Sequence, residues 1–411
     1  MRFSTKILPS RCGNVGIIEL NNLKSLNALD LDMIRAMTDV LSHWQKDDTL
    51  KLTLVTSVQQ QHNNNNKMEL KQEESNKKQT KFFCAGGDVK SIYESIQTST
   101  KGQNPKIGYG IPGHLSSDFF REEYILNYKI ATQQHSKLPQ ISIWDGIVMG
   151  GGVGITIHGK YRIATENTIF AMPETAIGFF PDVGSMYWIP TLLSSSKSKT
   201  SGIGLYLALT GTRLKADDLL YTGIATHYIP SNHLQSLRKS LIETSLVDSG
   251  ENSDDIAKDI LSSFHLDIPL DQSILYRNKD EMDDIFCNKN SVKEIITYLE
   301  TRNTKSTFAS NTLATLRKMS PTSLKVTYEG LHRSKSNTLS LKDVLKMEYR
   351  MSQRFMQLKS DFHEGIRAVL VDKDYNPKWD PSTLDLVDDN EIQSYFDVDL
   401  GCHDLDVESH S

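Results

Sequence analysis

The stretch from Asp145 to Gly154, Asp-Gly-Ile-Val-Met-Gly-Gly-Gly-Val-Gly, restricts the fold of this chain more than any other part of the sequence. It follows Ile141–Trp144, an apolar run typical of a buried β-strand. A strand that leads through a glycine cluster into a helix presents backbone N–H groups without side-chain obstruction, at the positive end of the helix dipole. The segment therefore predicts a strand–turn–helix unit of an α/β protein, with a place for negative charge at the turn.

Two further segments have the composition of a functional site. Phe82–Val89 reads Phe-Phe-Cys-Ala-Gly-Gly-Asp-Val, a strand that ends in a glycine pair and in Asp88, which is well placed to begin a helix. Ala171–Gly184 is a Gly/Pro-punctuated loop that carries Glu174 and Asp182 eight residues apart. A carboxyl group in apolar surroundings has a raised pKa and can act as acid, base or nucleophile. Taken singly, glycines kept for tight packing and two exposed loop acids explain these segments as well.

The N-terminal half alternates strand and helix patterns. Leu29–Trp44 has an apolar stripe at helical spacing and begins at Asp30, a residue type that favours helix starts. Further strands are predicted at Phe3–Leu8, Val15–Leu20, Leu50–Ser57, Tyr161–Ala164 and Thr168–Ala171. Helices then dominate, at Leu205–Leu209, Ala216–Thr222, Ser291–Thr301, Leu339–Gln357 and His363–Val371. We expect an α/β core over residues 1–230 and a helical C-terminal region over residues 231–411.

Three segments fall outside this pattern. Residues 59–80, which include Asn63–Asn66, hold almost no apolar side chain, and this is typical of a disordered Asn/Gln-rich insertion. The chain after Lys378 lacks Lys and Arg and holds many acids, so we expect a solvated acidic tail that frays near its end. A Gly-x-Gly-x-x-Gly match from Gly108 to Gly113 is rejected as a dinucleotide fingerprint, because no strand precedes it and no helix follows it.

The composition excludes several classes of protein. A formal net charge of −5 gives no basic field for nucleic acid or an anionic membrane, and no apolar run is long enough to cross a bilayer. The four cysteines are scattered, which argues against a disulfide scaffold and favours a reducing compartment. The 12 histidines show no metal-ligand spacing, so we expect no metal. The basic N-terminus resembles the edge of a mitochondrial presequence, although a strand at Phe3–Leu8 is preferred there.

These segments and the run from Lys24 to Leu29, Lys-Ser-Leu-Asn-Ala-Leu, occur in the order and near the spacing of the crotonase (enoyl-CoA hydratase/isomerase) superfamily, which the chain resembles closely. Six stretches are similar to its branch of thioester hydrolases that act on 3-hydroxyisobutyryl-CoA: Phe119–Tyr124, Gly150–Gly154, Phe170–Gly178, Phe180–Gly184, Met319–Lys325 and Asp361–Ala368. The resemblance covers nearly the whole chain outside the insertion, residues 194–200 and the extreme C-terminus. It implies an α/β fold, a crotonase-type spiral of β-β-α turns, with a helical C-terminal region that completes the active-site wall.

The resemblance also implies roles for single residues. The backbone N–H groups of Gly87 and Gly151 would form an oxyanion hole, the pair of donors that stabilises charge on a thioester carbonyl oxygen. Glu174 would be the main catalytic carboxylate, with Asp182 across the substrate and Glu123 lining the acyl pocket. The residues implied to lie along the adenine and pantetheine of CoA are Lys24, Leu26, Ala85, Gly87, Asp88 and Val89. CoA is part of the substrate, and no separate cofactor is implied.

One departure from the hydratase pattern selects the branch. Enoyl-CoA hydratases carry a second glutamate three residues after the oxyanion-hole glycine, and that position is Gly154 in this chain. Asp182 supplies a second carboxylate from another direction, which suits hydrolysis of 3-hydroxyisobutyryl-CoA, a step of valine breakdown. The sequence has no Gly-x-Ser-x-Gly motif, so a serine-hydrolase route is not indicated. Whether Glu174 attacks the thioester or activates a water stays open.

Two other functions stay open at this point. One is a different crotonase activity, such as enoyl-CoA hydration or isomerisation, and the other is a non-enzymatic binding role on the same fold. Release of free thiol from the acyl-CoA would distinguish the hydrolase from both. The pathway of the family implies the mitochondrial matrix, and homo-oligomerisation is left open.

Overall fold

The computed structural model describes residues 4–58, 80–99, 111, 113–133, 138–192, 202–245, 252–398 and 404–408. The predictions for residues 59–79, for residues 194–200 and for the rejected motif at Gly108 and Gly110 lie outside these ranges. Among the helices of the described ranges, none is both long and apolar enough to cross a membrane.

The described strands form two sheets. The larger has the order β1-β2-β3-β5-β7-β9, in which β1 is antiparallel to β2 and the other pairs are parallel, while the smaller is a parallel sheet of order β4-β6-β8. The strands are β1 (Ile7–Cys12), β2 (Val15–Leu20), β3 (Leu52–Ser57), β4 (Phe82–Cys84), β5 (Gln140–Trp144), β6 (Ile147–Met149), β7 (Tyr161–Ala164), β8 (Ile169–Ala171) and β9 (His227–Tyr228). Parallel pairs need crossover connections, and at least one α-helix lies along the chain between the two strands of each parallel pair.

Helices surround both sheets. The α-helices are α1 (Leu31–Trp44), α2 (Val89–Ser99), α3 (Leu115–Gln133), α4 (Gly151–Ile157), α5 (Ser185–Leu192), α6 (Ile203–Thr210), α7 (Ala216–Thr222), α8 (Leu234–Ser245), α9 (Ser253–Phe264), α10 (Ile274–Arg277), α11 (Lys279–Phe286), α12 (Val292–Arg302), α13 (Thr307–Leu316), α14 (Pro321–Asn337), α15 (Leu341–Phe355), α16 (Asp361–Ile366) and α17 (Asp389–Ser394). As predicted, α1 begins after Asp30, because that carboxylate accepts a hydrogen bond of 2.9 Å from the amide of Met33.

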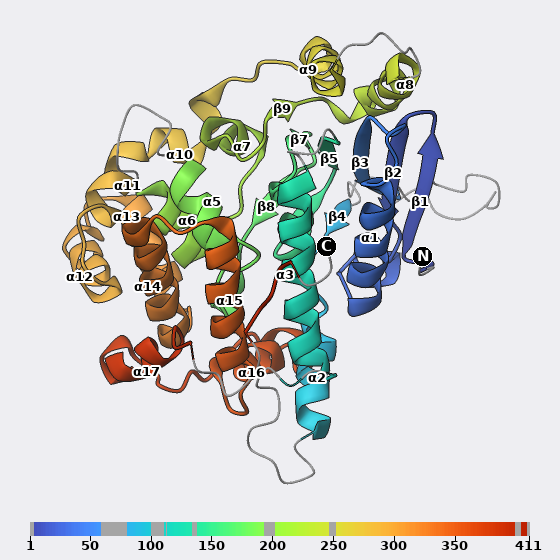
Figure 1. Cartoon of the computed structure of the whole chain (residues 1–411). Coiled ribbons are helices and arrows are strands. Elements are labelled where there is room, and N and C mark those ends of the chain that lie inside the picture. Colours follow the sequence, from blue (N-terminus) through green and yellow to red (C-terminus); the bar gives the residue numbers. More distant parts are fainter. Residues whose placement is uncertain are drawn as a thin grey trace, which may run out of the picture.

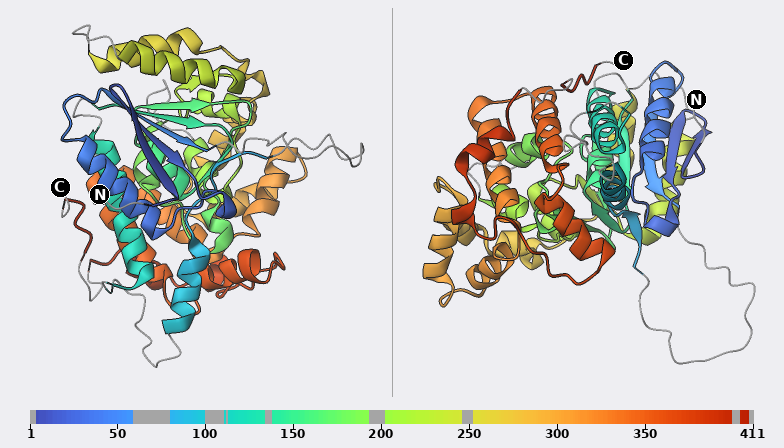
Figure 2. Two further views of the ribbon diagram at one scale, coloured as in Figure 1. Left: turned by 90° about the vertical axis from the view of Figure 1, so that its right-hand side faces the viewer. Right: turned by 90° about the horizontal axis from the view of Figure 1, so that it is seen from below.

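The central strands of the larger sheet are apolar on both faces because both faces are covered. Ile18 and Val55 belong to the main buried cluster together with the apolar face of α1. Ile17 and Leu54 belong to a second cluster, which α8 and α9 complete through residues such as Leu237. Figure 2 shows α8 and α9, in yellow, beside the sheet on the side of this second cluster.

The smaller sheet positions the predicted site. β4 leads into Gly87, β6 leads into Gly151, and β8 leads into the 3-10 turn η4 (Glu174–Ile177). Because the three strands are parallel neighbours, their carboxyl ends meet at one edge of the sheet, where ligands of α/β proteins commonly bind. The pairing thus brings together three segments that are distant in sequence.

The C-terminal helices close this edge. In Figure 1, α15 stands beside α3, and α16 lies below them next to α2. One continuous buried cluster extends from Ile7 in β1 to Val407, so it crosses residue 230, and the division into two regions stays a prediction. Gly365 of α16 packs so closely on the backbone of Ile177 that a Cβ atom there would overlap it.

Three expectations need correction. The first strand begins at Ile7 rather than at residue 3, and its backbone pairs with β2 as far as Cys12. The last predicted helix begins earlier, at Asp361, and its second half, Arg367–Val371, is a π-helical turn. The acidic tail is not simply solvated, because its apolar residues pack into the main cluster. Those buried tail residues are Val387, Ile392, Tyr395, Phe396, Leu405 and Val407.

Candidate active site

Two backbone amides lie side by side at the edge of the smaller sheet. Leu29 donates to Gly86 O at 2.8 Å and accepts from the Asp88 amide at 2.7 Å, so the N–H of the intervening Gly87 points to the other side of its strand. Gly151 is the first residue of α4, where amides have no intrahelical partner. A Cβ atom on Gly151 would lie 3.4 Å from the Gly87 nitrogen. The predicted pair of donors is therefore adjacent and can face one oxygen atom.

The glycines of the α4 turn are required for different reasons. Gly150 has φ +45°, and a Cβ atom on it would lie 3.0 Å from Glu174 Oε1. A Cβ atom on Gly151 would lie 2.5 Å from Glu123 Oε1. At Gly152 the obstacle is instead the side chain of Cys84 below it. The positive φ explains Gly150, the close approach of the Glu123 carboxylate favours glycine at position 151, and packing on the side chain and backbone oxygen of Cys84 explains Gly152.

Glu123, Glu174 and Asp182 form a buried carboxylate cluster, with 2%, 6% and 5% of their surfaces exposed. Burial raises the pKa of Glu123 well above its usual value, and the negative charges of Asp182 and Glu174 add to this effect. Burial and Asp182 likewise raise the pKa of Glu174. For Asp182 burial raises the pKa to about 7, although a hydrogen bond from Tyr124 opposes that rise. Such perturbed pKa values are typical of catalytic carboxyl groups.

Several buried polar atoms in and beside this cluster have no hydrogen-bond partner among the described residues. Glu123 Oε1 and Glu174 Oε2 are buried and lack a hydrogen bond to any described residue, and so do both amide atoms of Asn127. Buried polar groups in folded proteins nearly always have a partner. The unsatisfied atoms therefore indicate a space that polar atoms of a ligand or water occupy.

Helix α3 holds one side of the cluster. Tyr124 donates a hydrogen bond of 2.7 Å to Asp182 Oδ2, and its neighbour Glu123 reaches the glycine turn. Glu122 fixes the helix to α1, because Arg35 donates to its two oxygens at 2.7 and 2.6 Å. This paired geometry is the strongest form of an Arg–carboxylate contact. The helix is thus held in register with the site.

Gly154 lies one turn into α4, and no larger residue fits there. A Cβ atom on it would lie 2.7 Å from the Cβ of Val183 and 3.0 Å from Asn127 Nδ2. Val183 fills this space with its backbone at φ +54°, a conformation that β-branched residues rarely adopt. Val183 therefore fills the space beside residue 154 that the glutamate of a hydratase would need.

The predicted CoA residues lie in the turn at Lys24–Leu26 and in the segment around Gly87. Lys24 and Leu26 are exposed in the turn before Asn27, and the amide of Ala85 donates to Leu26 O at 3.1 Å. Asp88 has a structural task as well, because its carboxylate accepts hydrogen bonds from the amide and hydroxyl of Ser91 at the start of α2. Val89 is the first residue of that helix. Their contacts with CoA stay a prediction.

Four residues of the site were not predicted from the sequence. Tyr124 and Asn127 were not assigned because a polar residue on a helix carries no signal of its partner. His158 and Glu348 contact the Asp182 turn from α4 and α15, and nothing in the sequence brings these segments together. Cys84 lies at the site but does not suit a nucleophile, because burial raises its pKa to about 12.

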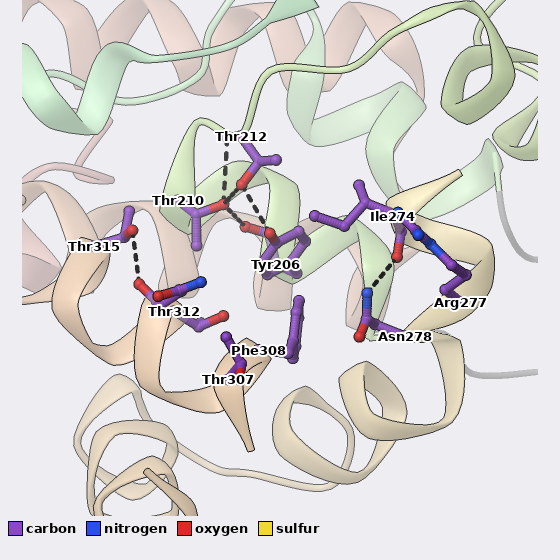
Figure 3. Close-up of a pocket in the computed structure, with 11 residues that line it drawn as sticks. Tyr206, Thr210, Thr212, Ile274, Arg277, Asn278, Thr307, Phe308, Thr312 and Thr315 are labelled. Carbon is purple, nitrogen blue, oxygen red and sulfur yellow. Dashed lines mark hydrogen bonds between the residues drawn. The ribbon is translucent and has the colours of Figure 1, made fainter. Parts of the chain in front are cut away.

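A separate cavity of about 280 Å³ lies between α6, α10 and α13. Figure 3 shows Tyr206, Thr210 and Thr212 joined by hydrogen bonds on one side of it, with Phe308 facing Tyr206. The two rings lie 5.3 Å apart. None of the residues that line it belongs to the glycine turns or to the carboxylate cluster, so it is distinct from the site described above.

Comparison with known proteins shows similarity over nearly the whole chain. The sequence profile of the enoyl-CoA hydratase/isomerase family matches residues 15–396. A Xenopus tropicalis protein named "3-hydroxyisobutyryl-CoA hydrolase, mitochondrial" is 41% identical over 401 residues, 97% of this chain and 90% of that protein. The human protein of the same name is 38% identical over 403 residues, with the same coverage. A solved carnitinyl-CoA dehydratase from Mycobacterium thermoresistibile is 31% identical, with a TM-score of 0.77 over 99% of this chain and 100% of that one.

Proposed function

The chain belongs to the enoyl-CoA hydratase/isomerase family, and we propose that within it the chain is a thioester hydrolase that converts 3-hydroxyisobutyryl-CoA and water into 3-hydroxyisobutyrate and CoA. The observation that carries this proposal is the packing at Gly154. Val183 fills the space where a hydratase would hold its second glutamate, while Asp182, the residue before it, supplies a carboxylate from the other side. The relatives named as hydrolases of this substrate match almost the whole chain at 38–41% identity.

The amides of Gly87 and Gly151 would hold the thioester carbonyl oxygen. Attack on the carbonyl carbon places negative charge on that oxygen, and each preorganised donor typically stabilises the transition state by roughly 3–4 kcal/mol. Because Glu174 Oε1 lies directly against Gly150, its carboxylate stands beside the carbon that these amides activate. This placement suits either attack on the carbon or activation of a water.

Two routes of hydrolysis are compatible with these residues. In the general-base route, Glu174 takes a proton from water as the water oxygen attacks, and it returns that proton to the CoA sulfur when the C–S bond breaks. In the covalent route, Glu174 displaces the CoA thiolate to give a mixed anhydride, and water then hydrolyses the anhydride. Asp182 has one oxygen bound to Tyr124, which leaves the other for the substrate's 3-hydroxyl group or for the water.

A hydratase or dehydratase activity is the second candidate, because two solved relatives have such names. Besides the dehydratase above, an enoyl-CoA hydratase from Rhodobacter sphaeroides is 28% identical, with a TM-score of 0.75. Addition of water to a double bond by a pair of glutamates would need an acid at Gly154. The contact with Val183 leaves no room for one.

The compartment and the assembly of the protein are part of the proposal. The relatives with this activity carry "mitochondrial" in their names, which supports a mitochondrial location, and within it we propose the matrix. The substrate is an acyl-CoA, and no nucleic acid, membrane or metal has a role in the reaction proposed. Whether two or more copies associate is decided by sedimentation of the purified protein.

One preparation tests the activity against its rivals. Thiol release from 3-hydroxyisobutyryl-CoA is followed with a thiol reagent, and hydration of crotonyl-CoA is followed by loss of enoyl absorbance. We expect thiol release without hydration. Hydration without thiol release would make the protein a hydratase, and the absence of both in a folded protein that binds CoA would make it a binding protein.

A further inference from the structure

Glu348 lies in the middle of α15, fully buried, with its carboxylate against the turn that carries Asp182. Its Oε2 accepts a hydrogen bond of 2.6 Å from the amide of Gly184, and its Oε1 accepts one of 3.0 Å from the amide of Met186. These amides lie at the start of α5, and their hydrogen bonds oppose the rise that burial causes in the pKa of Glu348. The side chain thus bridges the C-terminal region and the Asp182 turn with both of its oxygens.

The turn needs such a support because its backbone is strained. Val183 has φ +54° and Gly184 has φ +82°. A non-glycine residue in this region costs on the order of 1–3 kcal/mol and persists only where its surroundings hold it. On the other side of the turn, His158 Nε2 lies 2.8 Å from the carbonyl oxygen of Val183. Burial lowers the pKa of His158 to about 4, so the ring is neutral and its Nε2–H donates this bond.

We propose that Glu348 is a positioning residue for the hydrolysis, acting only through Asp182. It keeps the strained turn in a fixed position relative to the amides of Gly87 and Gly151. This position determines where the Asp182 carboxylate contacts the substrate. Both oxygens of Glu348 are engaged by the turn, so Glu348 itself does not touch the substrate. This inference rests on the proposed function and on the role of Asp182 within it.

The test is a double-mutant cycle between Glu348→Gln and Asp182→Asn. An amide at position 348 keeps the size of the side chain but turns one acceptor into a donor that opposes a backbone N–H. We expect kcat for thiol release to fall roughly a hundredfold, because a displacement of about 1 Å at a catalytic group has that cost. KM should stay within about threefold, since the loss falls on the transition state. In the Asp182→Asn background the same substitution should cost less than about threefold more, because its target is gone.

Asp218 provides a matched control. It is also buried, at 4% exposure, and also accepts backbone hydrogen bonds, from Leu275 at 3.2 Å and from Lys215 at 3.3 Å. Asp218→Asn should lower thermal stability while leaving kcat within about threefold of wild type, and its effect should be the same in both backgrounds. A general loss of packing would make the two variants behave alike, and that result would overturn the proposal.

A second variant keeps the test decisive where Glu348→Gln folds poorly. His158→Leu removes the other hydrogen bond to the turn, and kcat is scaled to the folded fraction measured by circular dichroism. We expect the same loss in kcat, again confined to the Asp182 background. Full kcat per folded molecule in both variants, or equal losses with and without Asp182, would overturn the inference. Absence of thiol release from the wild-type protein would instead contradict the proposed function, and the two failures are therefore distinct.

Discussion

Tyr124 binds Asp182 through a hydrogen bond of 2.7 Å from its phenolic oxygen to Oδ2, and this bond opposes the rise that burial causes in the pKa of Asp182. The hydrogen bond favours the ionised carboxylate, because an acceptor that carries a charge binds a donor more strongly. Tyr124→Phe removes the donor and leaves the rest of the ring in place. The pKa of Asp182 should then rise further above about 7.

The consequence is visible in the pH dependence of the reaction. If the ionised form of Asp182 is the active one, kcat/KM of the wild-type protein increases as the pH rises through about 7. In Tyr124→Phe this rise in kcat/KM, the acid limb of the pH profile, should move to higher pH by roughly one pH unit. That is the effect of losing one charge-assisted hydrogen bond. An unchanged limb would show that another group of the cluster, such as Glu123 or Glu174, controls this part of the profile.

Asp182 should destabilise the folded protein at neutral pH. In the unfolded chain its carboxyl group ionises near about pH 4, whereas in the folded protein it keeps its proton to about pH 7. Between these values the folded state binds more protons, so the contribution of Asp182 to stability falls as the pH rises. Asp182→Asn should therefore gain stability relative to wild type between pH 4 and 7.

The free energy of unfolding of Asp182→Asn must be compared with that of the wild-type protein at each pH. His158 and His227 have pKa values lowered to about 4, and they change the stability of both proteins in the opposite sense. Urea unfolding of wild type and Asp182→Asn at pH 5 and pH 7.5 removes this common part. A gap that stays constant over this range would mean that Asp182 is ionised throughout.

Glu174→Gln should abolish turnover without weakening the binding of CoA. Glutamine keeps the shape of the side chain beside Gly150 but can neither attack the thioester nor accept a proton from water. Acid–base groups contribute on the order of a hundredfold or more to rate, so thiol release should fall at least that far. Calorimetric titration with CoA measures the binding. A variant that keeps more than a tenth of the wild-type rate would show that Glu174 is not the main carboxylate.

Gly154→Ala tests the packing that separates this chain from the hydratases. The new methyl group would lie 2.7 Å from the Cβ of Val183, and such overpacking of a core costs about 1–3 kcal/mol. The free energy of unfolding from urea denaturation measures the loss. Val183→Gly alone should cost stability because it empties a buried site, but in that background Gly154→Ala should cost less than it does in the wild type, because the methyl group then has room. An equal cost in both backgrounds would mean that the space at Gly154 is not limited by Val183.

The sequence predicts those parts of the fold whose local pattern and tertiary surroundings agree. Val15–Leu20 and Tyr161–Ala164 are strands with the predicted bounds, because short apolar runs flanked by turn residues favour the β-strand conformation. Glu174 and Asp182 were assigned to the site by the resemblance to the family and not by their local segment, which two exposed loop acids would explain as well. Their burial depends on segments that are distant in the chain.

The sequence does not predict contacts between distant segments. Helix α3 is not among the helices that the residue pattern predicts, although Glu123 was assigned to the acyl pocket. Its apolar and polar residues are mixed around the helix, and many polar ones are buried. Glu348 reads as one more charged residue of an amphipathic helix, although it is fully buried. The apolar residues of the tail are too sparse to predict a helix or a strand, yet Leu405 packs into the core. In each case the partner is supplied by tertiary packing.

The hydrogen bonds from the Asp182 turn to Glu348 of α15 have a consequence for biosynthesis. A ribosome produces both glycine turns and both loop carboxylates long before it produces α15, and α15 is in turn fastened by Arg350, which pairs with Asp404. A nascent chain that ends before α15 carries both glycine turns and both loop carboxylates and still lacks the support for Asp182. A nonsense mutation between α14 and α15 would therefore yield a protein that keeps these four features and has no working site.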